Sequence, residues 1–363
     1  MHIWKKSSTF AAHLVYIKKR YNMLDTFNIS NRRYLGNKYK LLDWIKEVVE
    51  QNCQDVNSVF DVFSGTGSVA SAFKDKRLAV CDMMRSNYLA ALCWFSPEHV
   101  DLEKLAHLLE YYNKYDATNE DNYMSQNFGN TYFDLETCKK IGFIRDDIQN
   151  RFAAGEVNER ENACVITSLF YAMDRISHTC GHYDSFIQDG DYKGELVLRM
   201  PEIHYPLNPN NQIFCADSNS IVDDVDVDLA YLDPPYNSRQ YCDAYHLLEN
   251  IALWNKPEVY GIAKKMDRTH MKSKYCKSVQ ASVALEDLVR RLNCRYILFS
   301  YNTNGKKLQC RSNAKLSDEE IIRILSIRGD VQVFSKAYRG FDAGKSEFNK
   351  DNQERLFLCS VRR

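Results

Sequence analysis

The segment Asp233-Pro234-Pro235-Tyr236 constrains this chain more than any other part of its sequence. It directly follows an apolar run, residues 229–232, which predicts a buried strand. Proline has no N–H and fixes its own φ angle, so two prolines in succession end the strand in a stiff corner. In an open α/β sheet, ligands bind at the carboxyl ends of the strands. The segment therefore predicts a ligand site at such an end.

The groups at this corner suit a planar ligand that carries an amino group. The Asp233 carboxylate and the main-chain carbonyl of Pro234 are hydrogen-bond acceptors, and the ring of Tyr236 offers a flat surface. Two acceptors beside an aromatic ring match an exocyclic NH₂ such as that of adenine. A proline-rich turn with a capping aspartate is the alternative interpretation of the segment in isolation.

A second segment, residues 58–73, has the pattern of a strand, a glycine turn and a helix. Gly65 and Gly67 allow a tight turn and a close approach of the main chain to a ligand, which faces the helix N–H groups. The next predicted strand, residues 78–82, ends in a carboxylate suited to accepting both hydroxyls of a ribose. Because residues 65–70 also fit the G-x-G-x-x-A pattern of dinucleotide sites, a dehydrogenase stays open for this segment alone.

The N-terminal part contains a third candidate segment, in which a loop with Gly36 leads into a helix. Lys38 lies at the start of that helix, where the helix dipole favours an acid over a cation. A ligand carboxylate or phosphate accounts for the cation, and a solvated lysine is the alternative. We expect residues 1–30 to form a loosely attached leader, with Met23 as a second candidate start of translation.

The pattern changes between residues 96 and 205, which are rich in polar and aromatic residues. One clear apolar helix, residues 162–173, interrupts the alternation of strands and helices, which predicts an inserted and mainly helical domain. Residues 178–182 read His-Thr-Cys-Gly-His, but no second cluster completes a tetrahedral metal site. We therefore predict no bound metal.

Strands and helices alternate again after residue 205. The strand at residues 212–217 is predicted to end in Asp217, and another strand covers residues 294–302. The last two predicted strands, residues 331–338 and 355–361, are separated by a polar loop that fits a hairpin. The fold class is therefore α/β, with a mostly parallel sheet and a C-terminal antiparallel hairpin.

Composition limits where the chain can bind nucleic acid and in which compartment it is expected. Forty-eight basic residues balance 48 acidic ones, so any basic surface must be local. The basic run at residues 264–277 is such a candidate for phosphate contact, with a solvated loop as the alternative. The twelve cysteines form no C-x-x-C pair, which predicts reduced thiols and a cytoplasmic location. No apolar run reaches the length of a membrane span.

Taken in this order, the segments resemble the alpha-class, Dam-like N6-adenine DNA methyltransferases. The stretch from Asp233 to Glu249 looks closest to the FokI-type modification methyltransferases. The resemblance implies a Rossmann-like methyltransferase sheet that binds S-adenosylmethionine, formed by residues 31–95 and 206–363. It also implies that the insert at residues 96–205 recognises the target sequence.

The resemblance implies a role for each segment. The catalytic residues are Asp233, Pro234, Pro235 and Tyr236. The cofactor-binding residues are Tyr34, Gly36, Lys38, Asp61, Phe63, Gly65, Thr66, Gly67, Asp82 and Asp217. The DNA-binding residues are Arg239, Lys264, Lys265, Arg268, Lys272 and Lys274. The implied partners are double-stranded DNA and, in a restriction-modification system, a cognate endonuclease.

Two other functions stay open. One is methylation of another amine: cytosine N4, an RNA adenine or a protein glutamine. The glutamine enzymes begin this corner with Asn rather than Asp233, and the aromatic insert favours duplex DNA. The other is a non-catalytic DNA-binding relative, which the intact Gly65, Gly67 and Asp82 disfavour. Methylation at a cytosine carbon needs a nucleophilic thiol, usually in a Pro-Cys pair, and none of the seven prolines precedes a cysteine.

Overall fold

A computed structural model describes residues 25–32, 34–116, 120–192, 194–204, 206–235, 239–303, 316–337 and 353–362. The chain divides into two compact units, which we call the sheet unit and the helical unit. The sheet unit contains the described residues of Lys38–Met84, Gln212–Ala244 and Arg268–Arg363. The helical unit contains those of Met1–Asn37, Arg85–Asn211 and Tyr245–Asp267.

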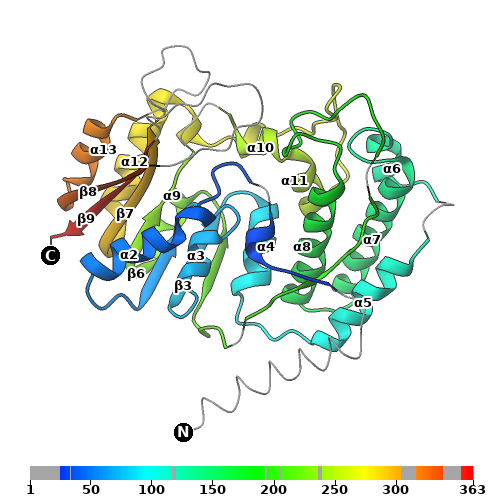
Figure 1. Ribbon diagram of the computed structural model, residues 1–363, viewed down its shortest axis with the longest axis horizontal. Helices are drawn as coiled ribbons and strands as arrows, with labels where there is room; N and C mark the ends of the chain where they lie inside the picture. The colour runs from blue at the N-terminus through cyan, green and yellow to red at the C-terminus, as the bar shows by residue number, and fades with distance from the viewer. Residues whose placement is uncertain are drawn as a thin grey trace, which may run out of the picture. The chain divides into compact units, whose positions relative to one another are not determined.

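The sheet unit is built on seven strands in the order β5-β3-β2-β6-β7-β9-β8 (Figure 1). Their bounds are β2 (Ser58–Asp61), β3 (Arg77–Asp82), β5 (Gln212–Cys215), β6 (Asp226–Leu232), β7 (Asn293–Thr303), β8 (Gly329–Ala337) and β9 (Gln353–Val361). The first five strands in the sheet order are parallel, and β9 runs antiparallel to both β7 and β8. The predicted α/β class and the antiparallel C-terminal pair are therefore confirmed. The loop between β8 and β9 lies outside the described residues.

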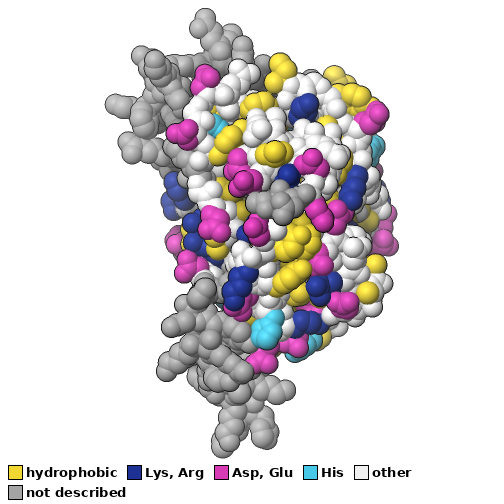
Figure 2. All heavy atoms as spheres, turned by 90° about the vertical axis from the view of Figure 1, so that its right-hand side faces the viewer, with side chains coloured by type: hydrophobic (Ala, Val, Ile, Leu, Met, Phe, Trp, Pro, Cys, Tyr) yellow, Lys and Arg dark blue, Asp and Glu magenta, His cyan; other side chains and the backbone are white. Residues whose placement is uncertain are grey.

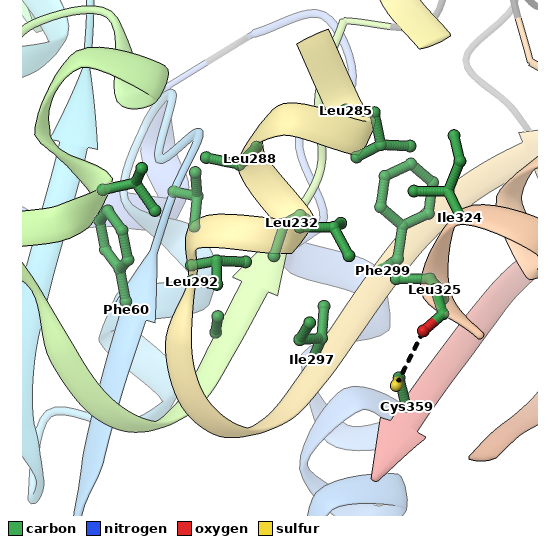
Figure 3. Packing of buried hydrophobic residues seen from close by; sticks show 14 of the residues in the cluster. Phe60, Leu232, Leu285, Leu288, Leu292, Ile297, Phe299, Ile324, Leu325 and Cys359 are labelled. Carbon is green, nitrogen blue, oxygen red and sulfur yellow. Dashed lines mark hydrogen bonds between the residues drawn. The ribbon is translucent and has the colours of Figure 1, made fainter. Parts of the chain in front are cut away.

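The core strands are buried on both faces, which is why they read as continuous apolar runs. The helices of this unit are α2 (Leu42–Asn52), α3 (Ser68–Ala72), α9 (Ser218–Ile221), α10 (Tyr241–Ala244), α12 (Ser278–Arg291) and α13 (Asp318–Leu325). Leu285 and Leu288 of α12 and Ile324 of α13 pack against Ile297 and Phe299 of β7 (Figure 3). This packing fixes one face of the sheet and leaves the strand ends at its edge to carry polar groups.

The helical unit contains six α-helices among its described residues, with two short parallel strands. Their bounds are β1 (Thr26–Phe27), α4 (Arg85–Phe95), α5 (Leu102–Lys114), α6 (Tyr123–Phe128), α7 (Leu135–Ala153), α8 (Glu159–Ile176), β4 (Met200–Pro201) and α11 (His246–Leu253). The predicted helix at residues 162–173 corresponds to the middle of α8, which is buried along most of its length. Besides residues 96–205, the unit takes in the described residues of 31–37, 85–95, 206–211 and 245–267, which were predicted to belong to the catalytic part. It also contains residues 25–30, which were predicted to belong to a leader.

Surface charge is mixed on the face drawn in Figure 2, where basic, acidic and hydrophobic side chains lie interspersed. This mixing agrees with the balanced composition. In the part of the chain that the structure describes, none of the helices is both long enough and apolar enough to cross a membrane.

Candidate active site

Four carboxylates of the sheet unit lie at or just after the carboxyl ends of its parallel strands. Asp61 and Asp82 are the last residues of β2 and β3, and Asp233 directly follows β6. Asp217 follows β5 by two residues and caps the short helix α9. Parallel strands end at the same edge of a sheet, so all four carboxylates belong to one edge, as the sequence predicts.

The glycine turn after β2 is tied to the end of β3. Gly65 and Gly67 have φ angles of 52° and 80°, values that favour glycine. The Gly65 N–H donates to Oδ2 of Asp82 over 2.9 Å, and the Met84 N–H donates to Oδ1 over 2.8 Å. Each carboxylate oxygen thus accepts one main-chain N–H.

Asp61 binds the start of α3, the helix that follows this turn. Its Oδ2 accepts the Ala70 N–H of α3 over 3.0 Å, and the side chain is buried. Burial raises the pKa of the Asp61 carboxyl to about 7, against the lowering effect of the Ala70 hydrogen bond. Thr66 is buried and shares a hydrogen bond with Ser68 over 2.9 Å. For Asp61 and Thr66 the structure therefore shows contacts that hold the turn.

Asp217 and Phe63 flank the turn through contacts of their own. Asp217 accepts the Asn219 N–H over 3.1 Å and lies 3.4 Å from the Lys274 ammonium. The half-buried Phe63 ring packs edge-on against Tyr275, with ring centroids 4.9 Å apart. Asp217 keeps about two-fifths of its side chain exposed, so it is accessible to a ligand.

Lys38 is buried and forms ion pairs with two carboxylates. Its Nζ lies 2.9 Å from Oδ2 of Asp233 and 3.4 Å from Oε1 of Glu354, on β9. Lys38 and Glu354 are only 5% and 2% exposed, so both charges are withdrawn from water and depend on each other. These protein carboxylates account for a cation at the start of a helix, for which the sequence left a ligand anion and a solvated lysine open.

Asp233 presents its second oxygen without a partner. Among the described residues, Oδ1 of Asp233 is buried and has no hydrogen-bond partner. Burial raises the pKa of the Asp233 carboxyl to about 6; Lys38 lowers this pKa and Glu354 raises it. At neutral pH Asp233 is therefore mainly a carboxylate, with one oxygen held by Lys38 and the other available to a donor.

The rest of the predicted catalytic corner is only partly described. Pro234 is buried and Pro235 is half-buried. Tyr236 lies outside the described residues. Arg239, the first described residue beyond this gap, is exposed.

The predicted N-terminal cofactor residues Tyr34 and Gly36 belong to the helical unit. The Tyr34 ring stacks on Tyr245, with centroids 4.4 Å apart and planes 12° from parallel. Asn87 donates to the Tyr34 hydroxyl over 2.9 Å, and the Leu35 N–H donates to the Tyr245 hydroxyl over 2.8 Å. Gly36 is exposed with φ 76°, so it forms the tip of a tight turn.

The basic run divides into paired and unpaired cations. Lys265 pairs with Asp184, Arg268 with Asp243 over 2.8 Å, and Lys274 with Asp217. Lys264, Lys272 and Lys277 have no ion-pair partner among the described residues, and Lys272 and Lys277 are exposed. These three lysines are therefore the cations of the run best suited to bind a phosphate.

Two buried glutamates were not assigned roles from the sequence. Glu354 is one, and its only sequence signal is an acidic residue just before an apolar strand. The other is Glu249 of α11, whose carboxylate accepts the Arg85 N–H over 2.7 Å and the Ser86 N–H over 2.9 Å. Glu249 thus satisfies the N-terminus of α4 from a distant part of the chain.

The known proteins to which this chain is similar are type II methyltransferases or modification methylases. Residues 34–309 match the family model of D12 class N6 adenine-specific DNA methyltransferases. The chain is 31% identical over 350 residues to the type II methyltransferase M.FokI of Planomicrobium okeanokoites, covering 90% of this chain and 52% of that protein. It is 31% identical over 351 residues to the modification methylase StsI of Streptococcus sanguinis, covering 90% and 51%.

A third relative is the type II methyltransferase M.NlaIII of Neisseria lactamica. It is 28% identical over 326 residues, covering 86% of this chain and 93% of that protein. The chain thus spans about half the length of M.FokI and StsI but nearly all of M.NlaIII.

Proposed function

Because the chain belongs to the family of D12 class N6 adenine-specific DNA methyltransferases, we propose that it transfers a methyl group from S-adenosylmethionine to N6 of an adenine in duplex DNA. The observation that carries the proposal is Asp233, which follows β6 with one oxygen held by Lys38 and the other unpartnered. The glycine turn and Asp82 belong to the same edge of the sheet.

Asp233 and Pro234 would act on the amine as paired acceptors. Adenine N6 is a weak nucleophile because its lone pair is conjugated with the ring. Hydrogen bonds from its two hydrogens to Oδ1 of Asp233 and to the Pro234 carbonyl favour a pyramidal nitrogen. An anionic Asp233 is also suited to receive the proton that the nitrogen loses once it carries the methyl group.

The residues at the glycine turn fit S-adenosylmethionine. Asp82 ends β3 with a carboxylate of the type that accepts ribose hydroxyls, and Gly65 and Gly67 let the main chain approach closely. When bound, this cofactor supplies an electrophilic methyl group on a sulfonium. Asp217 and Phe63 complete the proposed cofactor-binding set of the sheet unit. The contacts of Asp61, Thr66 and Lys38 give these three a supporting role in it. The proposed cofactor roles of Tyr34 and Gly36 rest on the sequence resemblance alone.

Target recognition is proposed for the helical unit, which contains residues 96–205. An adenine must leave the duplex to reach Asp233, which costs a few kcal/mol of unstacking. We assign to Tyr236 a stacking contact with the extruded base, which would recover part of that cost. This role rests on the residue type and its place after Pro235.

The biological setting is a proposal from the relatives. M.FokI and M.NlaIII are type II methyltransferases and StsI is a modification methylase, so we propose a modification role beside a cognate endonuclease. Nine of the eleven described cysteines are buried or half-buried, and all eleven are free. Free thiols support the proposed cytoplasmic location.

One experiment tests the activity directly. The protein is incubated with S-adenosylmethionine labelled on its methyl group and, in separate reactions, with duplex DNA, RNA or protein, and the nucleosides of the digested nucleic acids are separated by mass. We expect label in N6-methyl-2′-deoxyadenosine alone. Label in N4-methylcytosine, or in RNA or protein but not DNA, would replace the proposed substrate, and no transfer to any of these would exclude the activity.

Two unpaired lysines should carry part of the affinity for DNA. We expect the double variant Lys264→Ala, Lys272→Ala to bind all duplexes more weakly. The negative slope of log K against log salt should become shallower by up to about 0.9 per lost phosphate contact. The measurement is fluorescence anisotropy at several salt concentrations on two duplexes of unrelated sequence.

Lys265→Ala is the matched control, because Lys265 already pairs with Asp184. It should leave the salt slope unchanged. An unchanged slope in the double variant, or a change in sequence preference instead, would contradict phosphate contact by Lys264 and Lys272.

A further inference from the structure

Glu354 reaches the active-site edge because of the direction of its strand. The carboxyl ends of the parallel strands, including that of β6, form this edge. Since β9 runs antiparallel to β7, the amino end of β9 lies at the same edge, and Glu354 pairs there with Asn302 in the ladder. A residue at the start of the last strand is thereby brought beside Asp233.

The Glu354 carboxylate is held on two sides. The Ser300 hydroxyl of β7 donates to its Oε1 over 3.0 Å, and the same oxygen lies 3.4 Å from the Lys38 ammonium. Ser300 is fully buried and Glu354 nearly so. The sheet therefore fixes this oxygen, and through it the ammonium.

Lys38 lies between two carboxylates that differ in how they are held. Glu354 is bound by Ser300, whereas Asp233 has one oxygen without a hydrogen-bond partner among the described residues. The oxygen of Asp233 that it contacts is 2.9 Å away, and the other oxygen of Asp233 has no partner among the described residues. A buried ammonium with a single carboxylate is free to move between both of its oxygens. A second, fixed carboxylate restrains the ammonium on one side.

We propose that Glu354 is a positioning residue for methyl transfer. It holds the Lys38 ammonium on Oδ2 of Asp233, so that Oδ1 stays available to accept an N–H of the substrate amine. This inference rests on the proposed function, because it assigns the acceptor within that site.

The charges around Asp233 turn this geometry into a measurable pH dependence. The titratable groups that act on Asp233 are Lys38, Glu354, Asp61 at the end of β2 and Tyr231 within β6. With the Asp233 pKa at about 6, turnover should fall as the pH drops through 6, because a protonated carboxyl loses acceptor strength. Glu354 raises this pKa, so removing its charge should lower it.

The decisive variant is Glu354→Gln, which keeps the shape and an acceptor for Ser300 but removes the charge. We expect kcat to fall about tenfold or more with little change in KM. The acid limb of the kcat profile should move down by about half a pH unit or more, because the variant loses a like charge that shares the Lys38 ammonium with Asp233. A loss of activity that follows thermal stability alone, with the acid limb unmoved, would overturn the proposal.

Glu354→Asp is the companion variant, because it keeps the charge but shortens the side chain. It should lower kcat while leaving the acid limb where the wild-type protein has it. If Glu354→Gln does not fold, Ser300→Ala takes its place: it should lower kcat with KM nearly unchanged, and an unchanged kcat would overturn the proposal.

A substrate-independent readout separates this inference from the proposed function. The pKa of the Asp233 carboxyl, followed by carbon NMR without DNA, should fall in Glu354→Gln. If the wild-type protein methylates no DNA, the proposed function fails, whereas an unmoved Asp233 pKa in Glu354→Gln refutes the contact itself.

Discussion

Replacing Asp233 with asparagine is expected to slow methyl transfer by about 10²–10³-fold while leaving the affinity for S-adenosylmethionine nearly intact. Asparagine keeps the size of the side chain but turns one acceptor oxygen into a donor, which opposes the N–H groups of the amine. The loss of one such group in an active site costs about 10²–10³-fold in kcat. Glu354 still pairs with Lys38, so the ammonium is not left without a carboxylate.

The measurements are single-turnover methylation of duplex DNA and calorimetric titration with the cofactor. Asp226→Asn is the matched control, since Asp226 is an exposed carboxylate at the opposite end of β6. It should behave as wild type in both. If Asp233→Asn lost cofactor affinity as severely as activity, Asp233 would belong to the cofactor site rather than to the amine site.

Replacing Asp82 with alanine is expected to weaken S-adenosylmethionine binding by about 1.5–3 kcal/mol, or roughly 10–150-fold in Kd. The carboxylate is the proposed acceptor of the ribose hydroxyls. It also orders the glycine turn, because the Gly65 N–H donates to it. Both effects act on the cofactor, so affinity should fall more than the rate at saturating cofactor.

Asp75→Ala is the control for this variant, because Asp75 is an exposed carboxylate in the turn before β3. Calorimetry on both variants, with thermal unfolding in parallel, separates binding from folding. Unchanged affinity in Asp82→Ala would exclude the ribose assignment. A loss of kcat at saturating cofactor with Kd intact would place Asp82 in the chemistry instead.

The strands could be predicted because their signals are local. Apolar runs bounded by glycine, proline and polar residues recover all seven strands of the sheet to within a few residues. The residues that follow those runs, Asp82, Asp217 and Asp233, then fall at one edge because parallel strands share a direction. Local pattern and parallel topology thus account for most of the candidate site.

The helical unit shows where local pattern stops being informative. An apolar helix face indicates that a helix is buried but does not identify what buries it. Glu249 satisfies the N-terminus of α4 across 163 or 164 residues of sequence, and α4 and α11 fall in one unit with α8. The division of the chain into units therefore depends on contacts that no window of sequence contains.

The sequence by itself determined which strands end in a carboxylate and where the glycine turn and the proline corner lie. Each of these features depends on the backbone preferences of adjacent residues. Only the tertiary structure decided which charges neutralise each other. Lys38 meets Asp233 and Glu354 across the sheet, and Lys265, Arg268 and Lys274 pair with acids distant in sequence or on another element. A buried charge needs a partner nearby in space, and the folded sheet supplies that partner from positions up to 316 residues apart along the chain.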